Sequence, residues 1–322
     1  MEAEKDWDEE MGWDRNYAKK ALICDIETVK DHMPRLLRGR TTESIIEDVR
    51  KNGTAKSLNS LRDTVFTGIG IKREENVSAP VNIIKIGCNG FVTISILRNY
   101  CLLLQELGIE YGFLSKEYCC LAPALYGVLM RGHDRTLVDE SARKMMSGNV
   151  AQAKVLGAGN MVNFCLYCYW RAKWLLGDSD MPQLYAFDIL NSPELWEGKS
   201  MRLDQKVGYL SIAGGTAERR LRVYIPEYVQ ENIFSLPWQD YRGLLDRIDG
   251  LHVVDIINEN YPQFDELLWK QLRENNLDTL VVNHPHEYSL LRHAAKKESP
   301  RTKIVFLSDI LLQSLGVTPW MN

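Results

Sequence analysis

The chain lacks the features that would place it in a membrane or in a secreted class. Its apolar runs fall well short of the ~18 residues that a membrane-spanning helix needs, which predicts no membrane insertion. Its first residues, Met1 to Asp6, are acidic and have neither the basic nor the apolar region of a signal peptide. We therefore expect a cytoplasmic protein, and a length of 322 residues is typical of two domains or one duplicated domain.

An excess of positive charge and the common nucleotide-binding patterns are also missing. A net charge of −4 gives no reason to expect nucleic acid or an anionic membrane as a partner. Ala213-Gly214-Gly215-Thr216 follows a predicted strand, but it matches neither Gly-x-x-x-x-Gly-Lys-Ser/Thr nor Gly-x-Gly-x-x-Gly. We interpret this segment as a tight turn between a strand and a helix.

Cysteine is scarce and unevenly placed, because the chain has seven and none follows residue 168. Cys24 and Cys101 stand alone and are expected to be buried structural thiols. The other five form three groups, which are Cys88, Cys119-Cys120 and Cys165-Leu166-Tyr167-Cys168. In a cytoplasmic protein, clustered cysteines are more often metal ligands than disulfide partners.

Each group of cysteines follows a short apolar run that predicts a buried strand. These runs cover residues 81–86, 109–114 and 161–164, and predicted helices alternate with them, which indicates a parallel α/β sheet. Residues just past the carboxyl ends of neighbouring parallel strands converge on one crevice. The sequence thus predicts five thiols at one sheet edge, a ligand set for an iron–sulfur cluster or zinc, with uncoordinated thiols as the third alternative.

The later part of the chain repeats this strand and helix order with a period of roughly 120 residues. Residues 282–288 stand where residues 163–169 stand in the first unit. We therefore predict an α/β fold of two pseudo-symmetric parallel-sheet halves, preceded by a helical N-terminal segment; the three parts are residues 1–76, 80–192 and 206–317. Within the first part, Thr41 to Val49 predicts a capped helix that ends at Asn52-Gly53.

The cysteine spacing on duplicated α/β halves resembles the cysteine-rich CCG domain. That domain occurs in the cysteine-rich subunit of heterodisulfide reductase, in fused forms of that subunit, and in iron–sulfur subunits of glycolate oxidase and unusual succinate dehydrogenases. The resemblance is good over residues 80–192 and holds in outline over 206–317. It implies one noncubane [4Fe-4S] cluster per chain, with the ligands Cys88, Cys119, Cys120, Cys165 and Cys168. It also implies work within a complex that holds a ferredoxin-type iron–sulfur subunit and a flavin subunit.

The chain departs from the pattern of this family at several positions. Leu121 replaces the glycine after the cysteine pair, and Leu166-Tyr167 lacks the usual proline. In the second half, no cysteine is present, so no second cluster is expected; the corresponding positions are held by Gly214, Tyr261-Pro262, His284 and Glu287. A chain with one cluster cannot carry out the family's two-cluster disulfide cleavage unaided.

His284, His286 and Glu287 are a second group of candidate ligands, because imidazole and carboxylate suit several metals. A metal site needs three or four converging ligands, so we interpret these side chains as packing residues that hydrogen-bond locally in the space of the lost cluster. His133, in a charged loop after the cysteine pair, is expected to be solvated.

The sequence thus predicts an iron–sulfur redox subunit of a heterodisulfide-reductase-like complex, an oxidoreductase component active in electron transfer or in the thiol/disulfide chemistry of sulfur metabolism. Two alternatives remain open. One is a structural docking subunit of such a complex, and the other is a zinc-stabilised binding module.

Overall fold

The computed structural model of the chain describes residues 41–53, 66, 81–90, 93–122, 124–125, 134–176, 181–210, 241–256 and 264–320. Several predictions fall outside these ranges and concern the N-terminal helices before residue 41, Cys24, His133, Gly214 and Tyr261-Pro262. Among the described residues, no helix is long and apolar enough to cross a membrane.

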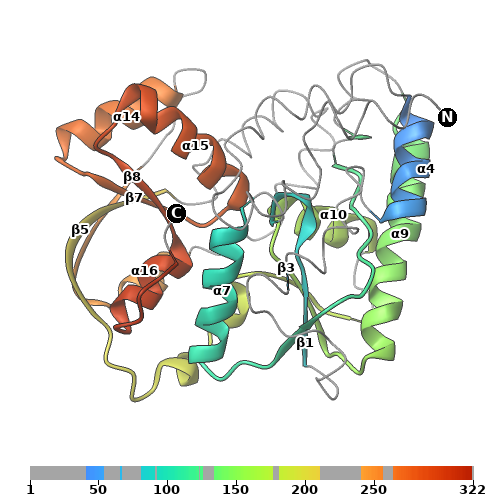
Figure 1. The fold of residues 1–322 in the computed structure, drawn as a ribbon, viewed down its shortest axis with the longest axis horizontal. Helices are drawn as coiled ribbons and strands as arrows, with labels where there is room; N and C mark the ends of the chain where they lie inside the picture. Colours follow the sequence, from blue (N-terminus) through green and yellow to red (C-terminus); the bar gives the residue numbers. More distant parts are fainter. Residues whose placement is uncertain are drawn as a thin grey trace.

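Two four-stranded parallel sheets form the framework (Figure 1). The first has the order β2 (Tyr111–Phe113), β1 (Asn82–Lys85), β3 (Asn160–Asn163) and β4 (Gln183–Tyr185). The second has the equivalent order β6 (Asp249–Asp255), β5 (Arg202–Leu210), β7 (Thr279–Val282) and β8 (Lys303–Phe306). All neighbouring strands pair in parallel. The predicted α/β class with two parallel sheets is therefore confirmed.

Helices connect the strands, and their faces bury the sheets. β1 and β7 are buried along their whole length, as is usual for strands that are covered on both faces. In the first half the helices are α6 (Gly87–Gly90), α7 (Ile94–Glu106), α9 (Thr136–Val155) and α10 (Leu166–Leu176), followed by the 3-10 helices η2 (Asp188–Leu190) and η3 (Pro193–Trp196). In the second half they are α13 (Arg242–Leu245), α14 (Phe264–Glu274), α15 (Pro285–Glu298) and α16 (Leu307–Ser314).

The two sheets end in the same local structure. Asn163 of β3 pairs with Tyr185 of β4, and Val282 of β7 pairs with Phe306 of β8. In each half an aspartate lies three residues after the paired residue of the last strand. The Asp188 carboxylate accepts a hydrogen bond from the Tyr185 N–H at 2.6 Å, and Asp309 accepts one from the Phe306 N–H at 3.1 Å. This register equates Val282 with Asn163, in agreement with the predicted correspondence of residues 282–288 with residues 163–169.

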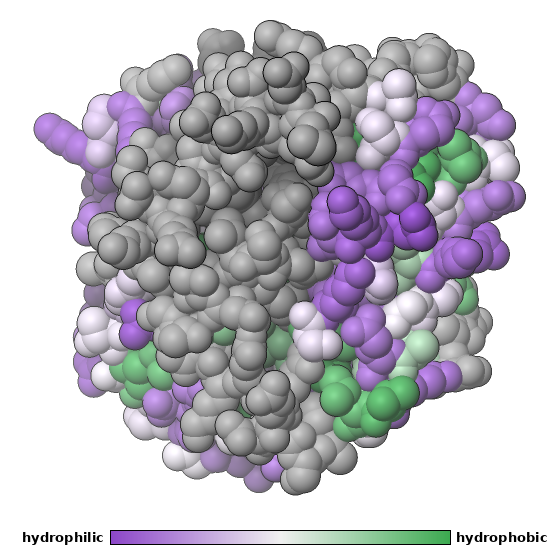
Figure 2. All heavy atoms as spheres, turned by 45° about the vertical axis from the view of Figure 1, so that its right-hand side comes forward, coloured by the Kyte–Doolittle hydropathy of each residue, from purple (hydrophilic) through white to green (hydrophobic). Residues whose placement is uncertain are grey.

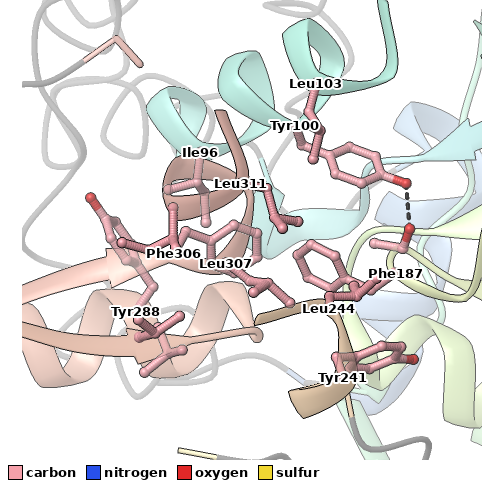
Figure 3. Packing of buried hydrophobic residues seen from close by; sticks show 14 of the residues in the cluster. Ile96, Tyr100, Leu103, Phe187, Tyr241, Leu244, Tyr288, Phe306, Leu307 and Leu311 are labelled. Carbon is pink, nitrogen blue, oxygen red and sulfur yellow. Dashed lines mark hydrogen bonds between the residues drawn. The ribbon is translucent and has the colours of Figure 1, made fainter. Parts of the chain in front are cut away.

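The halves share one apolar core, and its centre lies where α7 meets α16. Figure 3 shows Ile96 and Tyr100 of α7 beside Leu307 and Leu311 of α16, within one buried cluster that reaches both sheets. The Tyr100 hydroxyl donates to the Ala186 carbonyl at 2.5 Å, the dashed line in Figure 3. Because both sheets depend on this core, we expect the halves to unfold together.

The segment between the two predicted halves, residues 193–205, is built into the fold. It contains η3, and β5 begins within it at Arg202. Trp196 is buried, and its indole N–H donates to the Leu190 carbonyl at 2.8 Å. Burial of a large aromatic side chain with a satisfied N–H is typical of core structure rather than of a flexible connection.

Helix α4 (Thr42–Asn52) confirms the predicted capped helix. The Thr41 hydroxyl accepts a hydrogen bond from the Ser44 N–H at 3.1 Å, and Gly53 ends the helix with φ of +81°. In Figure 1 this helix lies along α9, and its buried face consists of Ile45 and Val49. It therefore belongs to the wall of the first half.

Candidate thiol site

The three cysteine groups lie past the carboxyl ends of three neighbouring strands, as predicted. Cys88 lies in α6 after β1, Cys119-Cys120 lie in the segment after β2, and Cys165 directly precedes α10 after β3. β2 and β3 lie on opposite sides of β1, so the strand order reverses between β1 and β3. Cys88 follows β1 and Cys165 follows β3, and the two residues therefore flank this position. In open parallel sheets, this position is where ligands bind.

The five thiols are neighbours in a continuous series. Cys119 interacts with both Cys88 and Cys120, Cys120 interacts with Cys168, and Cys168 interacts with Cys165. Cys88 is partly exposed, and the other four are buried. The structure therefore brings together all five predicted residues. It leaves Cys101 in the core of α7, where burial raises the pKa of its thiol to about 12, as expected for a structural cysteine.

The pKa of Cys120 is lowered, whereas the pKa of each of its neighbours Cys119 and Cys168 is raised. Hydrogen bonds from Cys119 and Cys168 lower its pKa, and these outweigh burial with the help of Lys85 and the Ala122 N–H. Hydrogen bonding with Cys120 raises the pKa of Cys119 and of Cys168 in turn. The surroundings of Cys120 thus favour its thiolate form over the thiolate forms of Cys119 and Cys168.

Lys85 places a buried ammonium group beside the thiols. Burial alone would lower its pKa, but Cys168, Cys120 and Glu117 together raise it above the usual value, so the group stays charged. Its Nζ atom makes no hydrogen bond with a nitrogen or oxygen atom of the described residues. Lys85 of β1 pairs with Asn163, and Leu210 of β5 pairs with Val282, the residue equivalent to Asn163. Leu210 is therefore the residue of the second half that corresponds to Lys85. The buried lysine is thus found in the half that has the thiols and is replaced by leucine in the half that lacks them.

Gly87 lets the turn after β1 approach α10 closely. Its φ is +68°, and a Cβ atom built on it would lie 2.7 Å from Cys165 Cβ and 3.0 Å from Cys168 Sγ. Real Cβ contacts are longer than this, so a side chain at residue 87 would displace the third cysteine group. The site is thus shaped by a missing side chain as well as by the thiols.

An apolar shell encloses the thiols. Four of the cysteines belong to a buried cluster with Ile45 and Val49 of α4 and with residues of α9 and α10. The Cys119 N–H donates to the Gly53 carbonyl at 2.7 Å, which ties the end of α4 to the cysteine pair. Removal of α4 would expose the site, so an N-terminal truncation that spares it has to end before Thr41.

Leu121, where the resembled family has glycine, adopts φ of +57°. This left-handed conformation is uncommon for residues other than glycine, asparagine and aspartate. The leucine side chain is nevertheless fully buried in the shell around the thiols. Leu121 thus combines a strained backbone conformation with an apolar side chain that is fully buried.

We expect Leu121→Gly to be more stable than Leu121→Ala by about 1 kcal/mol, because both lose the buried side chain and only glycine relieves the positive φ. At Leu175, a buried position inside α10, the order should be reversed by about 1 kcal/mol, since glycine is the poorer helix former. Urea unfolding of the four variants measures both differences. Equal free energies of unfolding for Leu121→Gly and Leu121→Ala would show that the positive φ at residue 121 is not strained.

The second half turns its own candidate residues toward the thiol site. His284 precedes α15 as Cys165 precedes α10, and Glu287 takes the place of Cys168. The Tyr167 ring, between Cys165 and Cys168 in sequence, lies 5.5 Å from the His284 ring and 5.7 Å from the His286 ring. Tyr167 also packs against the buried cluster that contains four of the cysteines, so this residue contacts both groups.

The predicted local hydrogen bonds of His284 are absent among the described residues. Its ring is fully buried, and neither Nδ1 nor Nε2 has a hydrogen-bond partner there, which corrects that part of the prediction. The ring, just past the end of β7, packs against Tyr167 instead of hydrogen-bonding locally. Burial, and then the charge of His286, lower the pKa of His284 well below its usual value, so the ring is neutral.

We expect His284→Phe to raise the free energy of unfolding by about 1–3 kcal/mol, because it keeps a ring against Tyr167 and removes two unpartnered nitrogens. The folded chain binds fewer protons at His284 than the unfolded chain, so the native protein loses stability as the pH falls below about 6.5, and the variant should lose less. Urea unfolding at about pH 7 and about pH 5.5 tests this. Exposed His252→Phe is the control, and a change in metal content would show that His284 is a ligand.

Among the described residues, no three side chains of His, Cys, Asp or Glu converge as ligands of a single metal ion. The three candidates of the second half therefore do not form such a site.

Sequence reasoning missed four residues that shape the site, namely Lys85, Gly87, Glu117 and Arg171. Lys85 had a detectable signal, because a lysine inside an apolar run that predicts a buried strand requires a partner. The other three depend on contacts between segments that are distant in the chain: the bonds of Glu117 and Arg171 span 31 and 51 residues, and Gly87 approaches Cys165, which lies 78 residues later (165 − 87).

Comparisons with known proteins leave this chain without assigned relatives. No protein-family model matches the sequence, and no curated protein does. Among solved structures, the glutamate racemase isoform RacE1 of Bacillus anthracis matches over 74% of this chain and 80% of its own, with 12% identity and a TM-score of 0.28. A likeness at this level carries no argument about the fold or the function of the chain.

Proposed function

We propose that Cys88, Cys119, Cys120, Cys165 and Cys168 hold one noncubane [4Fe-4S] cluster, and that the chain is an iron–sulfur redox subunit. The observation that carries the proposal is the series of five neighbouring thiols, four of them buried, beside the Lys85 ammonium group. Soft thiolates are the ligands of iron–sulfur clusters, and a cluster bound by them adds negative charge that a buried cation can offset.

The arrangement of the thiols favours a cluster of several irons over one zinc ion. A structural zinc site places four ligands around one centre, at about 2.3 Å for each sulfur. Here five thiols, one more than such a zinc site takes, lie in a series in which each interacts with the next. A cluster of several irons accepts ligands that are spread along its surface, and this suits the series of thiols better.

Bound at these thiols, the cluster would supply one-electron transfer, or an iron at which a thiol or disulfide binds. The chain's own residues would set its surroundings. Lys85 offsets negative charge, and the apolar shell around Cys119 and Cys120 excludes water. The resemblance to CCG-domain subunits supports a heterodisulfide-reductase-like complex, in which a ferredoxin-type or flavin subunit delivers the electrons.

A second candidate function is that of a docking subunit, and the second half is the observation that favours it. At the positions of Cys165 and Cys168 it has His284 and Glu287, so that half has kept the fold without the thiols. Iron analysis distinguishes a docking subunit that lacks a cluster from a redox subunit.

Anaerobic purification followed by iron and sulfide analysis tests the proposal. We expect about four irons and a similar amount of labile sulfide per chain, and a brown protein. Cys120→Ser should lose the colour and the iron, because serine is a poor ligand for this cluster. Cys101→Ser, a buried thiol outside the series, should keep both. Stoichiometric zinc without sulfide would overturn the proposal in favour of a zinc-stabilised module.

A further inference from the structure

We propose that Glu117 and Arg171 are positioning residues that assemble the three cysteine groups into one site before any metal binds. The inference rests on the proposed function in treating the thiols as a metal site. The contacts that carry it involve only protein atoms, so it can be tested apart from metal binding. Glu117 joins the first group to the middle group, and Arg171 joins the middle group to the third.

Glu117 lies two residues before Cys119, and its side chain is almost fully buried. One carboxylate oxygen accepts the Ile86 N–H at 2.9 Å, and the other accepts the Gly87 N–H at 2.7 Å. These two amides belong to the turn that carries Cys88. Hydrogen bonds to a carboxylate are stronger than bonds between neutral groups, so Glu117 holds the Cys88 turn against the segment of the cysteine pair.

Arg171 lies one helical turn after Cys168 on α10, and its side chain is 4% exposed. Its Nε donates to the Cys120 carbonyl at 3.3 Å, and its Nη1 donates to the Asp139 carboxylate of α9 at 2.7 Å. One guanidinium group thus connects α10, the cysteine pair and α9.

The fork of arginine is needed for this connection. A lysine carries one compact ammonium group on a flexible stem and cannot donate in two fixed directions at once. In addition, a buried charge that loses one of its partners is destabilising, because burial removes the water that would otherwise compensate it. We therefore expect the site to be sensitive to Arg171→Lys although the charge is kept.

Arg135 provides a matched control. It also pairs with Asp139, at 3.3 Å, and its guanidinium also lies over the Trp174 ring, at 4.6 Å compared with 5.0 Å for Arg171. Of the two, Arg171 is the one for which the described contacts include a bond to the cysteine pair. Arg135→Lys therefore repeats the change of side chain and spares the proposed role.

The experiment compares the alkylation rates of Cys119 and Cys120 in metal-free full-length protein, mapped by mass spectrometry with iodoacetamide as the probe. We expect Arg171→Lys to raise these rates about tenfold, the effect of losing a buried hydrogen bond to a charged group. Arg135→Lys should stay within about twofold of the native chain. Equal rates in the two variants would overturn the role of Arg171.

Glu117→Gln gives an independent measurement that does not need Arg171→Lys to fold. It should speed hydrogen exchange at the Ile86 and Gly87 amides and alkylation of Cys88, whereas the same change at an exposed position, Glu110→Gln, should leave both unchanged. Native exchange rates in Glu117→Gln would overturn the role of Glu117. Absence of iron in the native chain would reject the proposed function, and the alkylation comparison would still decide the positioning role.

Discussion

Replacing Gly87 by alanine is expected to abolish iron binding and to destabilise the chain by several kcal/mol. The added methyl group would lie 2.7 Å from Cys165 Cβ and 3.0 Å from Cys168 Sγ, so the turn and α10 would have to separate. Overpacking of this kind costs about 1–3 kcal/mol, and a positive φ costs a residue with a Cβ atom about 1–2 kcal/mol more. Urea unfolding and iron analysis of the same preparation measure the two effects.

Gly108→Ala is the control for this substitution. Gly108 has φ of +69°, close to that of Gly87, and nothing lies within 4 Å of the position of its Cβ. This variant should lose about 1–2 kcal/mol and keep its iron, since it adds backbone strain without a clash. If both variants lost stability and iron equally, the close approach of the Cys88 turn to α10 would be unimportant for the site.

Replacing Lys85 by methionine is expected to lower the reduction potential of the proposed cluster by on the order of 100 mV. Reduction adds an electron beside this ammonium, and one charge at close range contributes about 2 to 3 kcal/mol at an effective dielectric constant of about 20. Methionine preserves much of the side-chain volume, so the fold should persist. Iron content should also fall, because the bound cluster loses its buried counter-charge.

Lys116→Met is the matched control for the loss of a lysine near the cysteine pair. The Lys116 ammonium group donates to the Lys51 carbonyl at 3.1 Å in an exposed setting and lies over the Tyr118 ring. Screening by water should limit its effect on the potential to a small fraction of the Lys85 effect. An unchanged or raised potential in Lys85→Met would show that the ammonium does not serve the cluster.

The described surface carries few large exposed apolar side chains. The face shown in Figure 2 is mostly hydrophilic where its residues are described, with small separate hydrophobic areas. The large apolar side chains that are exposed among the described residues are Val81, Leu137 and Val155.

The sequence by itself determined the class of the fold and the place of the thiols. Short buried runs before Cys88, Cys119 and Cys165 required strands, and parallel strands bring their carboxyl ends to one edge whatever the details of packing. The capped helix from Thr41 to Gly53 was equally predictable, because its start and stop signals act within a few residues. Such local patterns are strong because each is satisfied without contacts from distant parts of the chain.

The tertiary structure alone decided what surrounds the thiols. The bonds of Glu117 to the Cys88 turn and of Arg171 to Cys120 join segments about 30 and 51 residues apart, and no periodicity encodes them. The hydrogen bonds predicted for His284 failed for the same reason, since its ring packs on Tyr167 from the other half. Burial and pairing of a polar side chain depend on what the rest of the chain brings near it, and this emerges only when both sheets are assembled around their common core.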